Sequence, residues 1–249
     1  MSDLMFPVQE RTMDLKPLPA QQVLGQRVDS DLDHKVLIRT DTGEIIAIVP
    51  LSYHLITNED IIGQFYAELR DREIPAFIDD TNSFADNHRM TVQTTLPEVN
   101  FQVDDSQIGL SIFVSNSYVG DGGIRVVFGA VEFKSGFTMY LSSTLHEVTI
   151  PRRKDVDLSR KVEDAVSYAL ALWPSVEEKI HKLGKTPLAP DFYEQIEGIF
   201  GETWEARIRK KKPATMWQAH SILSSFVSLE FKKEERGRLY TIVSTLFDL

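Results

Sequence analysis

Alternation of apolar and polar residues over several consecutive segments constrains this chain more than any other feature. Apolar residues recur at every second position in residues 90–96, 99–103 and 108–114, with a predicted turn at Pro97-Glu98. Residues 124–133 are almost continuously apolar. A period of two puts one set of side chains on one face of a sheet, and a continuous apolar run indicates a strand covered on both faces. The middle of the chain is therefore predicted to be an antiparallel sheet.

The segment before this sheet predicts a β-hairpin followed by a helix. Residues 36–49 form two β-rich runs, and Gly43 between them can adopt the positive φ of a short hairpin loop. Asn58 is the predicted N-cap of the helix, because apolar residues recur behind it at helical spacing and Glu59 and Asp60 suit the positive end of the helix dipole.

The period changes to 3.6 residues after Pro151. Asp157 is predicted to cap a long helix that is kinked or broken at Pro174, and three shorter helices are expected near 191–200, 215–229 and 234–247. The expected fold class is α+β: a β-hairpin, a helix, an antiparallel sheet of several strands, a long helix packed on the sheet, and a C-terminal helical region.

Three parts are expected along the chain. Residues 1–30 contain three prolines and predict an extended N-terminal arm, residues 31–185 an α+β core, and residues 186–249 a helical region on or beside that core. The first residues have neither a basic nor an apolar signal segment, and no apolar run approaches the roughly 20 residues of a membrane-spanning helix. A cytoplasmic protein without a membrane partner is expected.

Charge is distributed unevenly. The formal net charge of -10 excludes a uniformly basic nucleic-acid binder, and the absence of cysteine excludes disulfides, thiolate metal sites and cysteine nucleophiles. Residues 1–150 carry 10 Lys and Arg against 22 Asp and Glu, and residues 151–249 carry 17 against 15. The net charge is therefore -12 in the first part and +2 in the second, where the cations are grouped.

Two of the basic groups are predicted to contact nucleic acid. The first lies where the sheet meets the long helix: Arg152, Arg153, Lys154, Arg160 and Lys161. The second lies between two tryptophans, as the set Trp204, Arg207, Arg209, Lys210, Lys211, Lys212 and Trp217. Cations neutralise phosphates, and aromatic faces stack on bases. The alternative for the second group is a solvated charge run between two helices whose tryptophans belong to the core.

Two further sets of cations have less defined roles. Arg125 is the only cation in an apolar strand and is expected to face either DNA or a buried carboxylate. Lys232, Lys233, Arg236 and Arg238 form a third basic group near the C-terminus.

The histidines and aspartates give little indication of a metal site or a catalytic site. None of the six histidines stands at a metal-ligand spacing from another, and His220 is expected to be hydrogen-bonded at the edge of the core. The paired aspartates are predicted to occupy loops, with a Mg²⁺ site as the less favoured alternative. The groups are one set of three, Asp29, Asp31 and Asp33, and two pairs, Asp79 with Asp80 and Asp104 with Asp105. No catalytic residue, cofactor or metal is predicted.

Three segments resemble a known family. The run from Val114 to Gly129, which reads VSNSYVGDGGIRVVFG, is similar to the strand, short turn and Arg-containing strand of the phage/plasmid-like family of unknown function, domain of unknown function 932. Residues 53–60 resemble the lead into its first helix, and residues 216–226 its C-terminal aromatic helix. The likeness covers about Val36 to Phe247, and it fails at Lys134-Ser-Gly-Phe137, where the family often has Cys-Ser-Asn-Gly.

The resemblance implies a phage, prophage or plasmid accessory protein in the bacterial cytoplasm, and the family has no established catalytic residues. The order of elements also resembles single-strand annealing proteins of the RecT, Red-beta and Erf class, which oligomerise and bind single-stranded DNA along a basic groove. That likeness is an analogy at the level of fold.

The sequence therefore predicts a non-enzymatic protein that binds single-stranded DNA, as an annealing or recombination accessory, and forms homo-oligomers. The alternative is a phage or mobile-element accessory, anti-defence or virion-associated, that binds a host or phage protein partner. A Mg²⁺-dependent nuclease that uses Asp104 and Asp105 is the least favoured reading.

Overall fold

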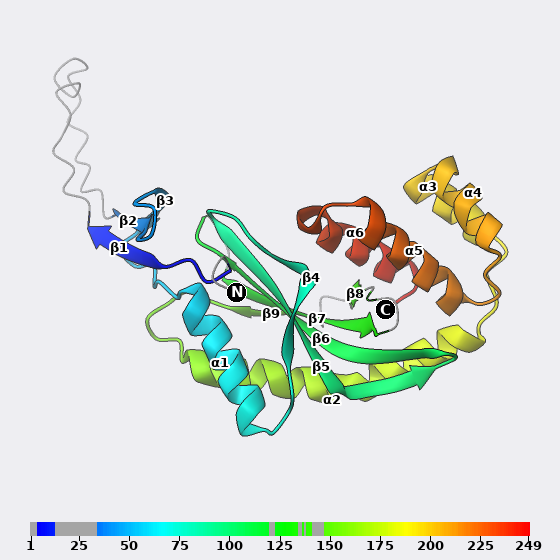
Figure 1. Cartoon of the computed structure of the whole chain (residues 1–249), viewed down its shortest axis with the longest axis horizontal. Helices are drawn as coiled ribbons and strands as arrows, with labels where there is room; N and C mark the ends of the chain where they lie inside the picture. The colour runs from blue at the N-terminus through cyan, green and yellow to red at the C-terminus, as the bar shows by residue number, and fades with distance from the viewer. Residues whose placement is uncertain (1–3, 13–33, 120–122, 134–135, 137, 141–146) are drawn as a thin grey trace, which may run out of the picture.

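The computed structural model describes residues 4–12, 34–119, 123–133, 136, 138–140 and 147–249, and it has the expected α+β class (Figure 1). Two antiparallel sheets and a set of helices make up the described part of the chain. The helices lie on both sides of the larger sheet, and the smaller sheet stands at one end of the molecule (Figure 1).

The smaller sheet has the strand order β1-β2-β3 and contains the predicted hairpin. Strands β2 (His34–Arg39) and β3 (Ile45–Pro50) pair antiparallel, and Gly43 between them has a φ of 76°. Strand β1 (Val8–Thr12) lies in the segment expected to be an extended arm and pairs with β2. Residues 13–30 of that segment lie outside the described residues.

The larger sheet confirms the predicted antiparallel sheet. Its order is β4-β5-β6-β7-β8, and β9 pairs with another part of β7. The strands are β4 (Phe77–Ala85), β5 (Arg89–Val103), β6 (Ser106–Ser117), β7 (Ile124–Glu132), β8 (Thr138–Tyr140) and β9 (Glu147–Ile150).

The predicted turn at Pro97-Glu98 is wrong, because these residues belong to one long strand, β5. Leu96 pairs with Leu110 and Asn100 pairs with Gly109, so residues 97–99 bulge out of the ladder without ending it. Proline cannot donate a main-chain hydrogen bond, and a bulge accommodates it inside a strand.

The helices follow the 3.6-residue pattern with two corrections. Their bounds are α1 (Asn58–Asp71), α2 (Leu158–Lys185), α3 (Phe192–Phe200), α4 (Glu202–Lys211), α5 (Met216–Glu230) and α6 (Lys233–Leu246). Helix α2 continues through Pro174 instead of breaking, since buried Trp173, Val176 and Ile180 hold both sides of the proline against the core. Helix α4 was not predicted, because its sequence is mostly charged.

The two faces of the larger sheet differ in chemistry. Helices α1 and α2 lie along one face, and α5 and α6 lie on the opposite side (Figure 1). The first face is apolar and packs on the helices in the main core. The second face carries a buried polar network, in which Gln93 Nε2 donates to Ser111 Oγ at 3.2 Å and Asn82 Nδ2 donates to Gln93 Oε1 at 2.8 Å and to Thr138 Oγ1 at 2.9 Å.

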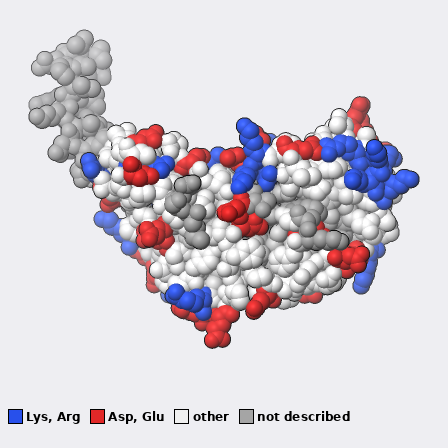
Figure 2. Space-filling model, in the orientation of Figure 1, with Lys and Arg blue, Asp and Glu red and all other residues white. Residues whose placement is uncertain are grey.

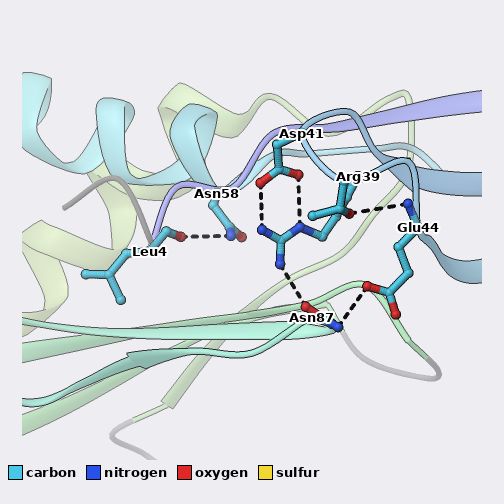
Figure 3. A network of polar contacts seen from close by, with 7 residues as sticks. Leu4, Arg39, Asp41, Glu44, Asn58 and Asn87 are labelled. Atoms are coloured by element: carbon cyan, nitrogen blue, oxygen red, sulfur yellow. Dashed lines mark hydrogen bonds and ion pairs between the residues drawn. The ribbon is translucent and has the colours of Figure 1, made fainter.

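Helix α1 begins differently from the prediction, because Thr57 is its N-cap. Thr57 Oγ1 accepts from the Asp60 amide at 3.1 Å, and Asp60 Oδ2 accepts from the Thr57 amide at 3.0 Å, which forms a capping box. Asn58 is fully buried instead. Its Nδ2 donates to the Leu4 carbonyl at 3.0 Å (Figure 3), and its Oδ1 accepts from Asn116 Nδ2 at 2.7 Å and from Tyr118 Oη at 3.0 Å.

We expect Asn58→Ala to lower the free energy of unfolding by about 3 kcal/mol, because it leaves buried partners without hydrogen bonds. Thr57→Ala removes only a cap and is expected to lower it by about 1 kcal/mol. Urea unfolding followed by circular dichroism measures both. A smaller loss for Asn58→Ala than for Thr57→Ala would contradict the role given to Asn58.

Candidate nucleic-acid interface

The second basic group lies on helix α4, and the charge order along that helix explains why it forms. Glu202 and Glu205 occupy the first turn, and Arg209, Lys210 and Lys211 occupy the last. This order places each charge at the end of the helix dipole that it stabilises. Lys212 ends the helix in a left-handed conformation, with a φ of 51°.

The five cations of this group are not equivalent. Arg207 pairs with Glu230 at 2.5 Å and its guanidinium carbon lies 4.0 Å from the centre of the Phe226 ring. Arg209 pairs with Glu205 at 2.5 Å and lies over Tyr193. Lys210, Lys211 and Lys212 are exposed, and none of them has an ion-pair partner among the described residues. These three lysines, which we call the basic edge, are therefore available to an anion.

Tertiary contacts hold the segment that follows the basic edge against the C-terminal end of α2. The Met216 amide donates to the Thr186 carbonyl at 2.9 Å, and Pro187 bridges to Thr215. A shallow surface groove follows the last turns of α2 there. Its lining includes Lys182 and Lys185, together with Pro174, Glu177, Glu178, His181 and Thr186. Figure 2 shows cations gathered at the end of the molecule where Figure 1 places α4.

The first basic group lies at the opposite end of α2. Arg153 is 3.5 Å from Asp155, and Lys161 is 3.8 Å from Asp164, while Lys154 and Arg160 are exposed. A helix of 28 residues is about 42 Å long, so the two predicted groups do not line one compact groove. Carboxylates lie next to Arg153 and Lys161, and their negative charge weakens the attraction of this group for phosphate.

The prediction that Arg152 contacts phosphate is wrong, because its side chain is buried inside the protein. Only 8% of the residue is exposed, its Nη1 donates to the Ile56 carbonyl at 3.1 Å, and its Nη2 donates to the Ser117 carbonyl at 3.1 Å. The guanidinium carbon lies 5.2 Å from the Tyr53 ring centre and 5.6 Å from that of Tyr118. Burial lowers the pKa of Arg152. Its role is to tie chain segments together.

The prediction that Trp204 and Trp217 stack on bases is also wrong. They are 9% and 3% exposed, so neither presents a ring face to a base. Trp204 stacks on Phe200 at 4.8 Å, and Trp217 stacks on His220 at 5.5 Å. The structure confirms the alternative for the two tryptophans, which belong to the core. Aromatic rings fill helix interfaces here because the helices are short and need large apolar contacts.

Two of the remaining cations, Lys233 and Arg236, connect elements of the fold, and Arg125 lies at the surface. Lys233 donates to the carbonyls of Asp80 and Ser83, and Arg236 Nη1 donates to Asn82 Oδ1 at 3.2 Å, so this part of the third group joins α6 to β4. Arg125 is exposed on β7, opposite Ser115 of β6. That exposure places Arg125 away from the main core.

The aspartate pairs form no metal site in the described part of the chain. No group of three His, Asp or Glu that could hold a metal ion occurs among the described residues. Asp104 and Asp105 form the predicted turn, between β5 and β6, but Asp79 and Asp80 lie in β4 and not in a loop. Asp29, Asp31 and Asp33 lie outside the described residues.

No family model, curated protein or solved structure matches this chain. The resemblance to the phage/plasmid-like family and the likeness to annealing proteins therefore stay predictions. Among the described residues, no helix has both the length and the apolar character needed to cross a membrane.

Replacing Arg152 tests whether it is structural. We expect Arg152→Met to lower the free energy of unfolding by about 2 to 4 kcal/mol, because two buried carbonyls lose a charged donor. The neighbouring exposed Arg153→Met is the control, with an expected change within about 0.5 kcal/mol. If the two variants have equal free energies of unfolding in urea, the structural role given to Arg152 is wrong.

His220 also differs from the prediction. It is fully buried, and neither ring nitrogen has a hydrogen-bond partner among the described residues. Trp217 stacks on one face of its ring, and Phe247 approaches edge-on at 5.0 Å. Burial lowers the pKa of His220 from its ordinary 6.5 to about 3, so the folded protein keeps the ring neutral.

The buried histidine predicts loss of stability in acid. Between pH 6.5 and 3 the unfolded chain takes up a proton at His220 and the folded chain does not, so stability falls as the pH falls through this window. His220→Leu should flatten the decline, which is worth about 1.4 kcal/mol for each pH unit at most. Urea unfolding at a series of pH values measures this, with His181→Gln as control. The same slope in wild type and His220→Leu would exclude the effect.

Proposed function

We propose that this protein binds single-stranded DNA through the phosphate backbone, with the basic edge as its contact. The observation that carries the proposal is the exposure of Lys210, Lys211 and Lys212 without ion-pair partners among the described residues. Lys182 and Lys185 line the groove at the end of α2, but Glu177 and Glu178 line it as well, so the proposal rests on the basic edge alone. Each of these three exposed lysines can neutralise a phosphate and release its condensed counterions.

Burial of both tryptophans changes the kind of binding that is proposed. Base stacking strengthens single-strand binding, and neither tryptophan ring is free for it. Contacts limited to phosphates do not depend on base sequence, and their strength falls steeply with salt. We therefore expect weak, salt-sensitive binding with little preference among base compositions.

Self-association belongs to the same proposal. A single copy offers only a short basic edge, and several copies on one strand would raise the total affinity without new contacts. The proposed protein is thus a non-enzymatic accessory of DNA annealing or recombination. The competing function is that of a protein-binding accessory, which the acidic first part of the chain favours.

Charge reversal of the basic edge tests the DNA proposal. We expect the triple variant Lys210→Glu, Lys211→Glu, Lys212→Glu to bind labelled single-stranded DNA at least about tenfold more weakly at low salt. The slope of log affinity against log salt should fall by about 2, because each single-strand phosphate contact contributes about 0.7. Fluorescence anisotropy over a salt series measures both quantities.

The other end of α2 supplies a control with the same change in net charge. The triple variant Arg153→Glu, Lys154→Glu, Lys161→Glu is expected to keep most of the affinity, because these side chains lie among carboxylates and far from the basic edge. Equal losses in the two triple variants would mean that net charge alone governs binding. Absence of any binding at low salt would reject the proposal.

A further inference from the structure

A groove between helix α1 and strand β4 forms a second surface, separate from the basic edge. Ile62 and Tyr66 of α1 line one side, and β4 with the residues before it lines the other. A neighbouring hollow shares Tyr66 and Ala76 with this groove and extends it to Arg70 and Glu73. The residues on the β4 side are Ala76, Phe77, Ile78 and Asp80.

The groove wraps around the outer edge of β4. Within the described residues β4 pairs only with β5. Ile78 is paired with Thr94 and packs on the main core, whereas Phe77 is paired with Thr95, whose hydroxyl meets Ser111 on the second face. A groove lined by side chains from both faces of a strand includes the edge between them, where main-chain N–H and C=O groups point outward.

Only the later part of this edge is covered by another element. Lys233 of α6 donates to the carbonyls of Asp80 and Ser83. Main-chain groups of an edge strand point outward at every second residue, which here are Ile78 and Asp80, and no described residue bonds in this way to Ile78. The first residues of β4 therefore offer a short open edge beside an apolar groove, the arrangement in which an extended peptide can be added as a strand.

Exposure and charge indicate what kind of peptide fits. Phe77 is 48% exposed, which is unusual for a phenylalanine in a strand and provides apolar surface for an inserted side chain. Glu73 and Asp80, one near each end of the groove, are exposed carboxylates. Arg70 is the one cation in the lining, and it lies 3.9 Å from Asp71. The groove is thus apolar along its wall with an exposed carboxylate near each end, and Lys233 reaches the Asp80 carbonyl at one of these ends.

We propose that this groove binds an extended, basic segment of a partner protein. The segment adds to β4 as a further strand, places an apolar side chain between Tyr66 and Phe77, and sets Lys or Arg side chains beside Glu73 and Asp80. Main-chain hydrogen bonds would supply affinity, and the apolar wall and the carboxylates would supply selectivity. The site is independent of the basic edge, so protein and nucleic acid could be held by one copy.

Selection from a random peptide library displayed on mRNA, with the full-length protein as bait, tests this proposal. We expect enriched peptides that alternate apolar residues with Lys or Arg, and fluorescence anisotropy of the synthetic peptides then measures affinity. Phe77→Ala should weaken binding at least about tenfold, because it removes part of the apolar wall. The double variant Glu73→Lys, Asp80→Lys should reverse the preference from basic to acidic peptides.

Matched controls separate the groove from surface effects in general. Ile48→Ala removes an exposed apolar side chain of β3, and the double variant Asp104→Lys, Asp105→Lys makes the same charge change in an exposed turn. Both should leave peptide affinity unchanged, and urea unfolding checks that every variant is folded. Peptides that carry N-methyl groups on alternate amides should bind at least about tenfold more weakly, since strand addition needs those donors.

Several results would overturn the proposal. These are no enrichment of any peptide, binding that Phe77→Ala leaves unchanged, or binding that N-methylation leaves unchanged. Sedimentation equilibrium tests whether a second copy of this chain occupies the groove instead. A dimer of the wild type that Phe77→Ala dissociates would show that a second copy of this chain fills the groove. None of these outcomes depends on DNA binding, which is measured separately.

Discussion

The structure depends on a junction of buried hydrogen bonds that joins the smaller sheet, helix α1 and the end of strand β6. Asn58 stands at its centre and binds the Leu4 carbonyl, Asn116 and Tyr118. Close by, Arg39 pairs with Asp41 and donates to Asn87, which donates to Glu44 (Figure 3). Polar groups buried at such a meeting point must be satisfied, because each unpaired one destabilises the fold by about 1 to 3 kcal/mol.

The same junction gives a physical meaning to the residues that resemble a known family. Segments 53–60 and 114–129 lie far apart in the sequence, yet Tyr53, Asn58 and Tyr118 surround the buried guanidinium of Arg152 or bind one another. Burial raises the pKa of Tyr118 from its ordinary 10 to about 12, so its hydroxyl stays a hydrogen-bond donor even in moderately alkaline solution. The pattern is explained by packing, and the proposed contacts with partners lie elsewhere: the basic edge on α4 and the groove between α1 and β4.

Expectations from sequence held best where the pattern was long and met few competing demands. The alternation in β5 and β6 and the 3.6-residue period of α2 both reflect burial of one face or stripe, and the continuous apolar run of β7 reflects burial on both faces. They failed at Pro97, where the chain stays in one strand instead of turning, and the alternative of a broken helix at Pro174 is excluded because α2 is continuous. Helix α4 escaped notice because its two buried residues, Trp204 and Ile208, are too few to show a period.

The sequence by itself determined the α+β class, the order of its main elements and the separation of a strongly acidic part from a mixed basic one, since periodicity and charge are properties of the residues alone. Tertiary structure decided which cations are accessible. Arg152 and Lys210 look alike in a basic run, but one binds buried carbonyls and the other faces solvent. It also created the groove beside β4, because only folding brings α1 and the open edge of a strand together.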